Sequence, residues 1–162
     1  MCRTRSTVAL HVIAVFSFVV TAAGLALMLR SGLGMGPWGA FEQALSKLAG
    51  MSFGTSVQLV GVALVAVAWT LGERPTLVTL LNMLLVGEFT DVFLRLVRTP
   101  EAPAVRAAVF AVGLVVYSIG VALCVSLRIG VGPREALMLG VMRRAHTSLR
   151  AARIAIDMSV LV

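Results

Sequence analysis

Residues 6 to 29 read STVALHVIAVFSFVVTAAGLALML, an apolar run without a charged residue, and this stretch decides the class of fold. Two further charge-free apolar runs cover residues 48–72 and 107–127. A helix needs about 20 apolar residues to cross the hydrocarbon core of a bilayer. Since every backbone group inside lipid must be hydrogen-bonded, such runs form helices, whereas a transmembrane barrel would show shorter alternating segments. The sequence therefore predicts at least three membrane-spanning helices.

The overall composition agrees with a membrane protein and excludes other classes. Hydrophobic residues make up 59% of the chain and charged residues 13%, whereas a soluble domain has about half and about a quarter. The formal net charge is +7, but the basic residues lie between apolar runs, where Lys and Arg set membrane topology. We therefore expect a lipid bilayer, and no nucleic acid, among the partners of this chain.

The N-terminal residues predict the orientation in the membrane. Arg3 and Arg5 precede the first apolar run, and basic residues accumulate on the cytoplasmic side. The run is also longer than the apolar region of a cleaved signal peptide, which has about 7 to 15 residues. We therefore expect an uncleaved first helix with the N-terminus in the cytoplasm.

A fourth helix is predicted between Arg74 and Arg95, with Pro75 in its first turn. On it Glu88, Asp91 and Arg95 are spaced three and four apart, so they share one face, with Asp91 able to pair with Arg95. Each charge costs about 3 kcal/mol near the bilayer centre. Either the helix ends early and these charges lie at the membrane interface, or they pair inside the bundle and line a polar path.

The remaining polar residues support no enzyme. Gln58 and Asn82 are single polar residues in apolar spans, which is typical of hydrogen bonds between helices. Glu42 and Glu135 lie on short mixed segments, where a solvated face explains them. No Ser, His and acid set, metal-ligand spacing or phosphate loop is found, so we expect no catalytic residues, no metal and no cofactor.

The chain matches itself when it is shifted by 96 positions. Gly24, Ala26, Leu27, Gly34, Gly36, Pro37 and Ala40 then fall on Gly120, Ala122, Leu123, Gly130, Gly132, Pro133 and Ala136. Each copy consists of a long helix, a Gly-x-Gly-Pro break and a short helix. We therefore predict an all-α, polytopic transmembrane helix bundle with an internal repeat. It forms one membrane domain, residues 1–162, with a first repeat at 6–97 and a second at 104–162 that we expect to be truncated.

The direction of the two repeats depends on whether the short segments, residues 38–48 and 134–147, cross the membrane. With or without such crossings, most of the basic residues lie on the side of the N-terminus. The charge distribution therefore leaves inverted and parallel repeats open.

The two breaks are the candidate ligand-binding residues. They comprise Gly34, Gly36, Pro37 and Trp38 in the first copy, and Gly130, Gly132, Pro133 and Arg134 in the second. A break leaves free N–H groups and the positive end of a helix dipole, and paired interrupted segments mark transporter binding sites. The simpler alternative is a tight turn between packed helices. We expect the two breaks to lie close together, where Trp38 and Arg134 would suit an anionic or zwitterionic solute.

Nucleotide binding is excluded at the first break. Gly34-Met35-Gly36-Pro37-Trp38-Gly39 matches the dinucleotide fingerprint G-x-G-x-x-G in letters, but that fingerprint requires a preceding strand and a βαβ unit. Here an apolar helix precedes it, and Pro37 removes one backbone N–H.

An ordered set of motifs resembles a known family. The motifs are Gly34-Met35-Gly36-Pro37-Trp38, Gly50-Met51-Ser52-Phe53-Gly54-Thr55, Arg74-Pro75, Asn82, Gly87-Glu88-Phe89-Thr90-Asp91 and Gly130-Val131-Gly132-Pro133-Arg134. Together they resemble the YczE/YyaS/YitT group of bacterial membrane proteins, whose pattern usually has proline at the position of Glu88. The resemblance implies a permease-like, multi-pass protein of the bacterial cytoplasmic (inner) membrane, and it implies no catalytic residue or substrate.

Two functions remain open at this point. The first is a small-solute transporter or permease-like protein, working as a homo-oligomer because so few spans barely enclose a path. The alternative is a non-transporting membrane accessory protein that binds a partner through an arginine-rich cytoplasmic loop, residues 143–153. Polar residues converging between the repeats would favour transport, whereas an apolar interior would favour the accessory role.

Overall fold

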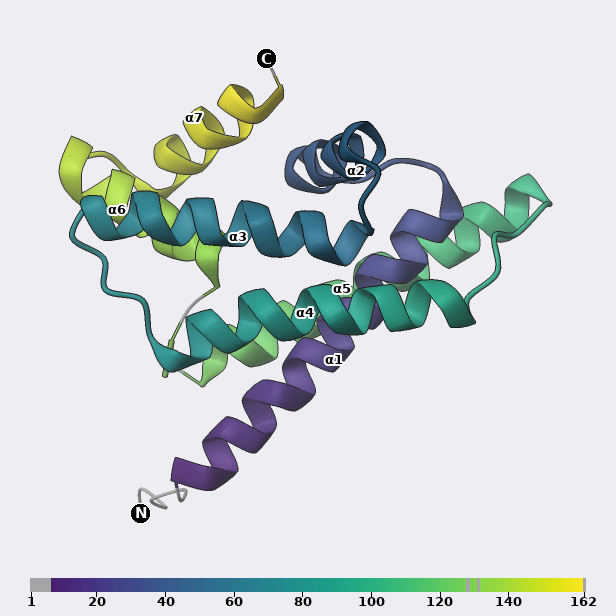
Figure 1. Ribbon diagram of the computed structural model, residues 1–162, viewed down its shortest axis with the longest axis horizontal. Coiled ribbons are helices and arrows are strands. Elements are labelled where there is room, and N and C mark those ends of the chain that lie inside the picture. Colours follow the sequence, from purple (N-terminus) through teal and green to yellow (C-terminus); the bar gives the residue numbers. More distant parts are fainter. Residues whose placement is uncertain (1–6, 128, 131, 162) are drawn as a thin grey trace.

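The structure is a computed structural model that describes residues 7–127, 129–130 and 132–161, and this part of the chain is helical without strands (Figure 1). The seven helices are α1 (Thr7–Ser31), α2 (Pro37–Ala49), α3 (Phe53–Thr70), α4 (Leu77–Leu96), α5 (Pro103–Ser126), α6 (Pro133–Ala145) and α7 (Leu149–Leu161). Four of them, α1, α3, α4 and α5, are long and apolar enough to cross a membrane. The predicted polytopic all-α fold is confirmed.

Helix α1 packs against both α4 and α5. It crosses α5 through two glycines: a methyl group at Gly24 would lie 2.7 Å from the Tyr117 Cα, and one at Gly120 would lie 2.6 Å from the Thr21 nitrogen. Small residues let membrane helices approach this closely. Residue numbers rise along α1 while those of their partners fall along α5, so the two helices are antiparallel.

Helix α3 runs antiparallel to α4, and the backbones approach at Gly54 and Gly87, where a methyl group on Gly87 would lie 2.7 Å from the Gly54 oxygen. Further along, Gly61 faces Met83. Helix α3 also packs against α2 and α6, and α7 packs against the same two short helices. The short helices therefore fill the space between α3 and α7.

The two short helices have matching ends. Each has 13 residues, begins with proline after a glycine N-cap, and is followed by a residue in the left-handed region, Gly50 (φ 64) or His146 (φ 50). At 1.5 Å per residue, each is about 20 Å long, shorter than the hydrocarbon core of about 30 Å. This length favours the alternative in which the short segments do not cross the membrane.

Two local predictions were wrong. Helix α4 begins at Leu77 after a capping box of Thr76 and Thr79, so Pro75 precedes the cap and is not in the first turn. The arginine-rich segment is mostly helical, because α6 continues to Ala145 and α7 begins at Leu149. The predicted loop therefore shrinks to residues 146–148.

Arg3 and Arg5, which predict the orientation, lie outside the described residues.

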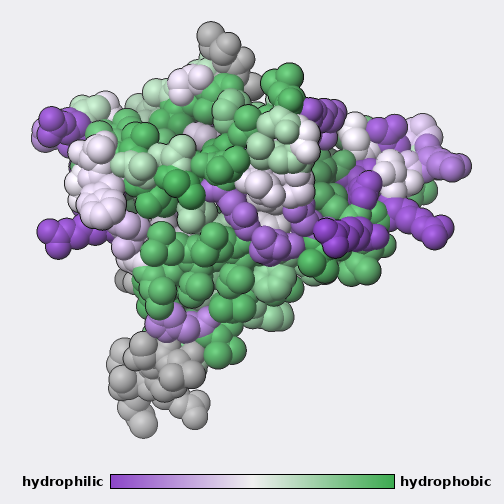
Figure 2. Space-filling view, viewed as in Figure 1, coloured by the Kyte–Doolittle hydropathy of each residue, from purple (hydrophilic) through white to green (hydrophobic). Residues whose placement is uncertain are grey.

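The surface agrees with a membrane location. Figure 2 shows hydrophobic residues over most of the visible face, with hydrophilic residues gathered at its two ends and in a strip across its middle. Large apolar side chains are exposed on each of the four long helices, among them Phe16, Val62, Leu84 and Val115. Apolar side chains on an outer surface are stable in lipid and costly in water.

Candidate functional site

The two Gly-x-Gly-Pro breaks bring residues 38 and 134 into contact. The guanidinium carbon of Arg134 lies 5.6 Å from the centre of the Trp38 ring, within the range of a cation–π interaction. Each residue directly follows the proline that begins its helix. Two long side chains from the first turns of α2 and α6 therefore meet, although the backbones of these two helices do not pack against each other.

Arg134 also forms an ion pair with a buried acid. Its Nη2 donates to Oε1 of Glu42 on α2, and the Glu42 side chain is only 1% exposed. The prediction that Glu42 lies on a solvated face was wrong. A signal was readable in the sequence: Trp38, Glu42 and Leu45 follow helical spacing, and Trp38 and Leu45 both pack against the apolar cluster around Val60. Glu42 therefore lies on the inward face of α2.

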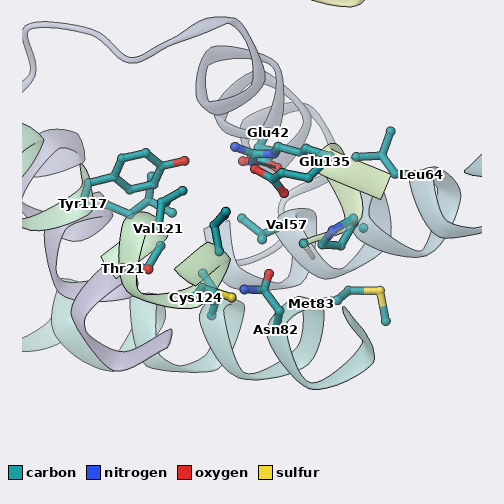
Figure 3. A pocket seen from close by; sticks show the side chains of 17 residues that line it. Thr21, Glu42, Val57, Leu64, Asn82, Met83, Tyr117, Val121, Cys124 and Glu135 are labelled. Atoms are coloured by element: carbon teal, nitrogen blue, oxygen red, sulfur yellow. Dashed lines mark hydrogen bonds and ion pairs between the residues drawn. The ribbon is translucent and has the colours of Figure 1, made fainter. Parts of the chain in front are cut away.

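A cavity of about 80 Å³ lies beside the ion pair (Figure 3). Its walls include Val57, Gly61 and Leu64 from the middle of α3, so it lies halfway along the bundle. Its polar lining side chains come from five helices; they are Thr21, Glu42, Asn82, Tyr117, Arg134 and Glu135. In Figure 3, Tyr117 and Asn82 point toward the carboxylates of Glu42 and Glu135.

Glu135 occupies the start of its own helix. It is the third residue after the N-cap Gly132, the position from which a carboxylate reaches back over a helix N-terminus. Its Oε2 lies so close above Gly132 that a side chain at Gly132 would collide with it. The negative carboxylate is therefore placed against the positive end of the α6 dipole.

A second, larger cavity of about 490 Å³ continues from the first. Arg134, Tyr117 and Glu135 line both cavities. The second cavity is also lined by Trp38, whose Nε1 donates to Oδ1 of Asp157 on α7 at 3.1 Å. Arg134 and Tyr117 thus stand where the two cavities adjoin.

The structure collects part of the predicted ligand-binding set. Gly132, Pro133 and Arg134 line the smaller cavity, and Gly36, Pro37, Trp38 and Arg134 line the larger one. Gly34 has a φ of +107° and no neighbour within 4 Å of an added methyl group, whereas Gly130 is pressed against Thr76 and Val78. These two glycines line neither cavity. Gly34 meets a requirement of backbone conformation, and Gly130 leaves room for its close neighbours.

The predicted polar residues of the third and fourth helices form a separate set of contacts. Gln58 Nε2 donates to the Leu84 oxygen and to Glu88 Oε1, both at 3.1 Å. Asp91 Oδ1 accepts from the Gly54 nitrogen at 2.8 Å, in the first turn of α3. Asp91 therefore interacts with a helix N-terminus, and among the described residues no ion pair joins it to Arg95.

Of the intramembrane polar residues predicted from the sequence, Asn82 alone lines the smaller cavity. Gln58 and Asp91 are partly buried between α3 and α4. Glu88 is exposed beside Gln58, and Arg95 is exposed near the end of α4. Within the described ranges, no group of three or more His, Cys, Asp and Glu residues lies close enough to hold a metal ion. Glu42, Tyr117 and Thr21 are site residues that sequence reasoning missed.

Comparisons with known proteins support the resemblance. A family model described as a family of unknown function, DUF6198, matches residues 8–162. An uncharacterized protein of Haemophilus influenzae is 30% identical over 148 residues, which are 91% of this chain and 68% of that protein. The uncharacterized membrane protein YczE of Bacillus subtilis is 28% identical over 150 residues, 88% of this chain and 67% of that protein. No solved structure matches the chain.

Proposed function

Because the chain belongs to DUF6198, a family of unknown function, we propose its role from its own site: it is a small-solute transporter of the bacterial cytoplasmic membrane. Its N-terminus is cytoplasmic, and the path of the solute runs through the two adjoining cavities. The observation that carries this proposal is the ion pair between the buried carboxylate of Glu42 and the partly exposed Arg134, beside a cavity in an apolar helix bundle.

The energetics of the ion pair support a functional role. Removing a charge from water costs several kcal/mol, and apolar residues of similar volume would stabilise a bundle at least as well. Ionisable residues inside membrane bundles therefore usually line solute or ion pathways. Glu42 and Arg134 line the smaller cavity together with other polar side chains, which favours transport over the accessory role, for which we expected an apolar interior.

The arrangement of the short helices also supports transport. Transporters built from inverted repeats place their sites where the N-terminal ends of interrupted helices meet. Here the side chains of Trp38 and Arg134, from the first turns of α2 and α6, are in contact. Helices α1 and α5, which the 96-position shift relates, are antiparallel, and Gly24 meets Tyr117 as Gly120 meets Thr21. Such a reciprocal contact is expected from a two-fold axis.

Labelling with thiol reagents tests the pathway without knowledge of the solute. Val121 lines both cavities, so Val121→Cys, with Cys2 and Cys124 replaced by serine and alanine, should react with a membrane-impermeant reagent in intact or inverted vesicles. The matched control is Val115→Cys on the same helix, whose apolar side chain is exposed on the bundle surface and should stay unlabelled in lipid. Protection of Val121→Cys from both sides would contradict a pathway through these cavities.

A further inference from the structure

One buried oxygen in the smaller cavity has no hydrogen-bond partner among the described residues. Oε1 of Glu42 accepts from Arg134, whereas Oε2 of the same carboxylate is buried and unpaired. A buried acceptor without a donor destabilises a protein, and a low dielectric makes that cost larger. Since Glu42 lines the cavity, a ligand there could supply the missing positive charge or donor.

The groups that would attract an anion are already occupied by the chain itself. Arg134 is paired with Glu42 and stacked on Trp38. The positive end of α6 is covered by the carboxylate of Glu135, which lies over Gly132. These contacts argue against an anionic solute as the main ligand of this site, which was the sequence-based expectation at Arg134.

The charges lining the cavity favour a cation. Arg134 contributes one positive charge, and Glu42 and Glu135 contribute two negative charges. In the adjoining cavity, Asp157 is 3.8 Å from Arg153, so these two charges offset each other. One negative charge is thus left over beside the smaller cavity, and a single monovalent cation would neutralise it.

The neutral lining groups and the volume suit a small cation. Thr21 donates its hydroxyl hydrogen to the Ser17 oxygen at 2.8 Å, which leaves the lone pairs of its oxygen available. The side chains of Asn82 and Tyr117 add two more oxygens that point into the cavity (Figure 3). A cavity of about 80 Å³ has room for a small ion together with water.

We propose that this cavity binds a small monovalent cation, of the size of sodium or ammonium, at the free Oε2 of Glu42, in a cavity whose polar lining includes the oxygens of Asn82, Tyr117 and Thr21. The site lies on the pathway of the proposed transport function, and this proposal rests on it. The cation is either the solute itself or an ion that moves with the solute.

Trp38 provides a direct reporter for the test. The chain has two tryptophans, and Trp69→Phe would leave Trp38, which touches Arg134, as the single emitter. The purified chain would be titrated with sodium chloride and, separately, with ammonium chloride, with choline chloride keeping the ionic strength constant. We expect a saturable change in Trp38 emission and a rise in melting temperature with at least one of the two salts. Sodium alone would identify a metal cation, and ammonium alone a protonated amine.

Three variants test whether the change in Trp38 emission arises from binding at this cavity. Glu42→Gln should weaken the response at least tenfold, whereas Glu73→Gln should leave it unchanged, because Glu73 pairs with Arg143 outside the cavity. Since Glu42→Gln also disturbs the ion pair, Asn82→Leu provides a second variant that removes one neutral oxygen, and it should weaken the response as well.

Several results would overturn the proposal. These are no change in emission or melting temperature when sodium or ammonium replaces choline, a response that follows the anion when sodium chloride is replaced by sodium phosphate, and an undiminished response in both Glu42→Gln and Asn82→Leu. The thiol-labelling result separates this proposal from the transport function. Labelled Val121→Cys without a cation response would overturn the cation site alone, and a cation response with protected Val121→Cys would overturn the pathway alone.

Discussion

The short helices α2 and α6 have the same backbone conformation at their N-caps and differ in the chemistry of their side chains. The N-cap of α2, Gly36, has φ −62° and ψ 169°, and that of α6, Gly132, has φ −65° and ψ 166°. Proline follows in both. Yet α2 contributes an aromatic ring and a buried acid, Trp38 and Glu42, whereas α6 contributes the cation Arg134. The Gly-x-Gly-Pro motif thus sets the path of the chain, and the residues placed on that path make the site.

The first glycines of the two breaks, Gly34 and Gly130, are also equivalent in sequence and different in their surroundings. Gly34 has a positive φ of +107° and open space around it, whereas Gly130 has no positive φ and is crowded by Thr76 and Val78. A side chain would be strained at the first position by backbone conformation and at the second by collision. Identical residues at equivalent positions are therefore required for different physical reasons.

The largest expected effect on stability comes from removing the ion pair between Glu42 and Arg134. Arg134→Ala should lower the free energy of unfolding by about 3–5 kcal/mol, because it leaves Glu42 buried and unpaired. Arg143→Ala removes a pair whose arginine is 65% exposed, and it should cost at most about 1 kcal/mol. Thermal or denaturant unfolding in detergent would measure both.

A double variant tests whether Glu42 and Arg134 stabilise each other. Glu42→Met combined with Arg134→Met should be markedly more stable than either single variant, since no unpaired charge stays buried. Strict additivity of the two single losses would show that the two residues do not interact.

A substitution on either helix should destabilise the crossing of α1 and α5 to a similar extent. Gly24→Ala and Gly120→Ala should each cost about 1–3 kcal/mol, because the added methyl group meets backbone atoms of the facing helix. Unfolding of the two variants in the same detergent would compare the losses. A large loss for one glycine and none for the other would argue against the reciprocal contact.

A smaller effect is expected where α4 meets the start of α3. Asp91→Asn should cost about 1 kcal/mol, because the carboxylate faces the positive end of the α3 dipole and accepts from Gly54. Glu88→Gln keeps a carbonyl oxygen for Gln58 and should cost less than about 0.5 kcal/mol. Folded yield and melting temperature in detergent would check this ranking, and equal losses would contradict it.

The smallest expected effect compares the second glycines of the two breaks. Gly132→Ala should cost about 0.5 kcal/mol, because the methyl group displaces the Glu135 carboxylate from the helix dipole. Gly36→Ala should be neutral, since its φ is −62° and no atom lies within 4 Å of the added methyl group. A melting temperature that falls equally in both variants would remove the distinction between the breaks.

The sequence by itself determined the membrane class and the local backbone of several elements. The run at residues 6–29 predicts α1, observed as Thr7–Ser31, because crossing lipid demands an unbroken apolar helix. Proline after glycine likewise predicts the starts of α2 and α6. These are local requirements, so a short window of residues is enough to show them.

Only the tertiary structure decided which polar groups meet. Glu42 and Arg134 are 92 positions apart. The repeat predicted that the two breaks lie close together, but no local pattern says that Arg134 pairs with Glu42. The nearer partner that i,i+4 spacing offered to Asp91 was Arg95, yet the approach of α3 supplied the nitrogen of Gly54 instead. A charge inside a bundle takes the partner that helix packing brings within hydrogen-bonding distance, and that partner depends on contacts between segments far apart in the chain.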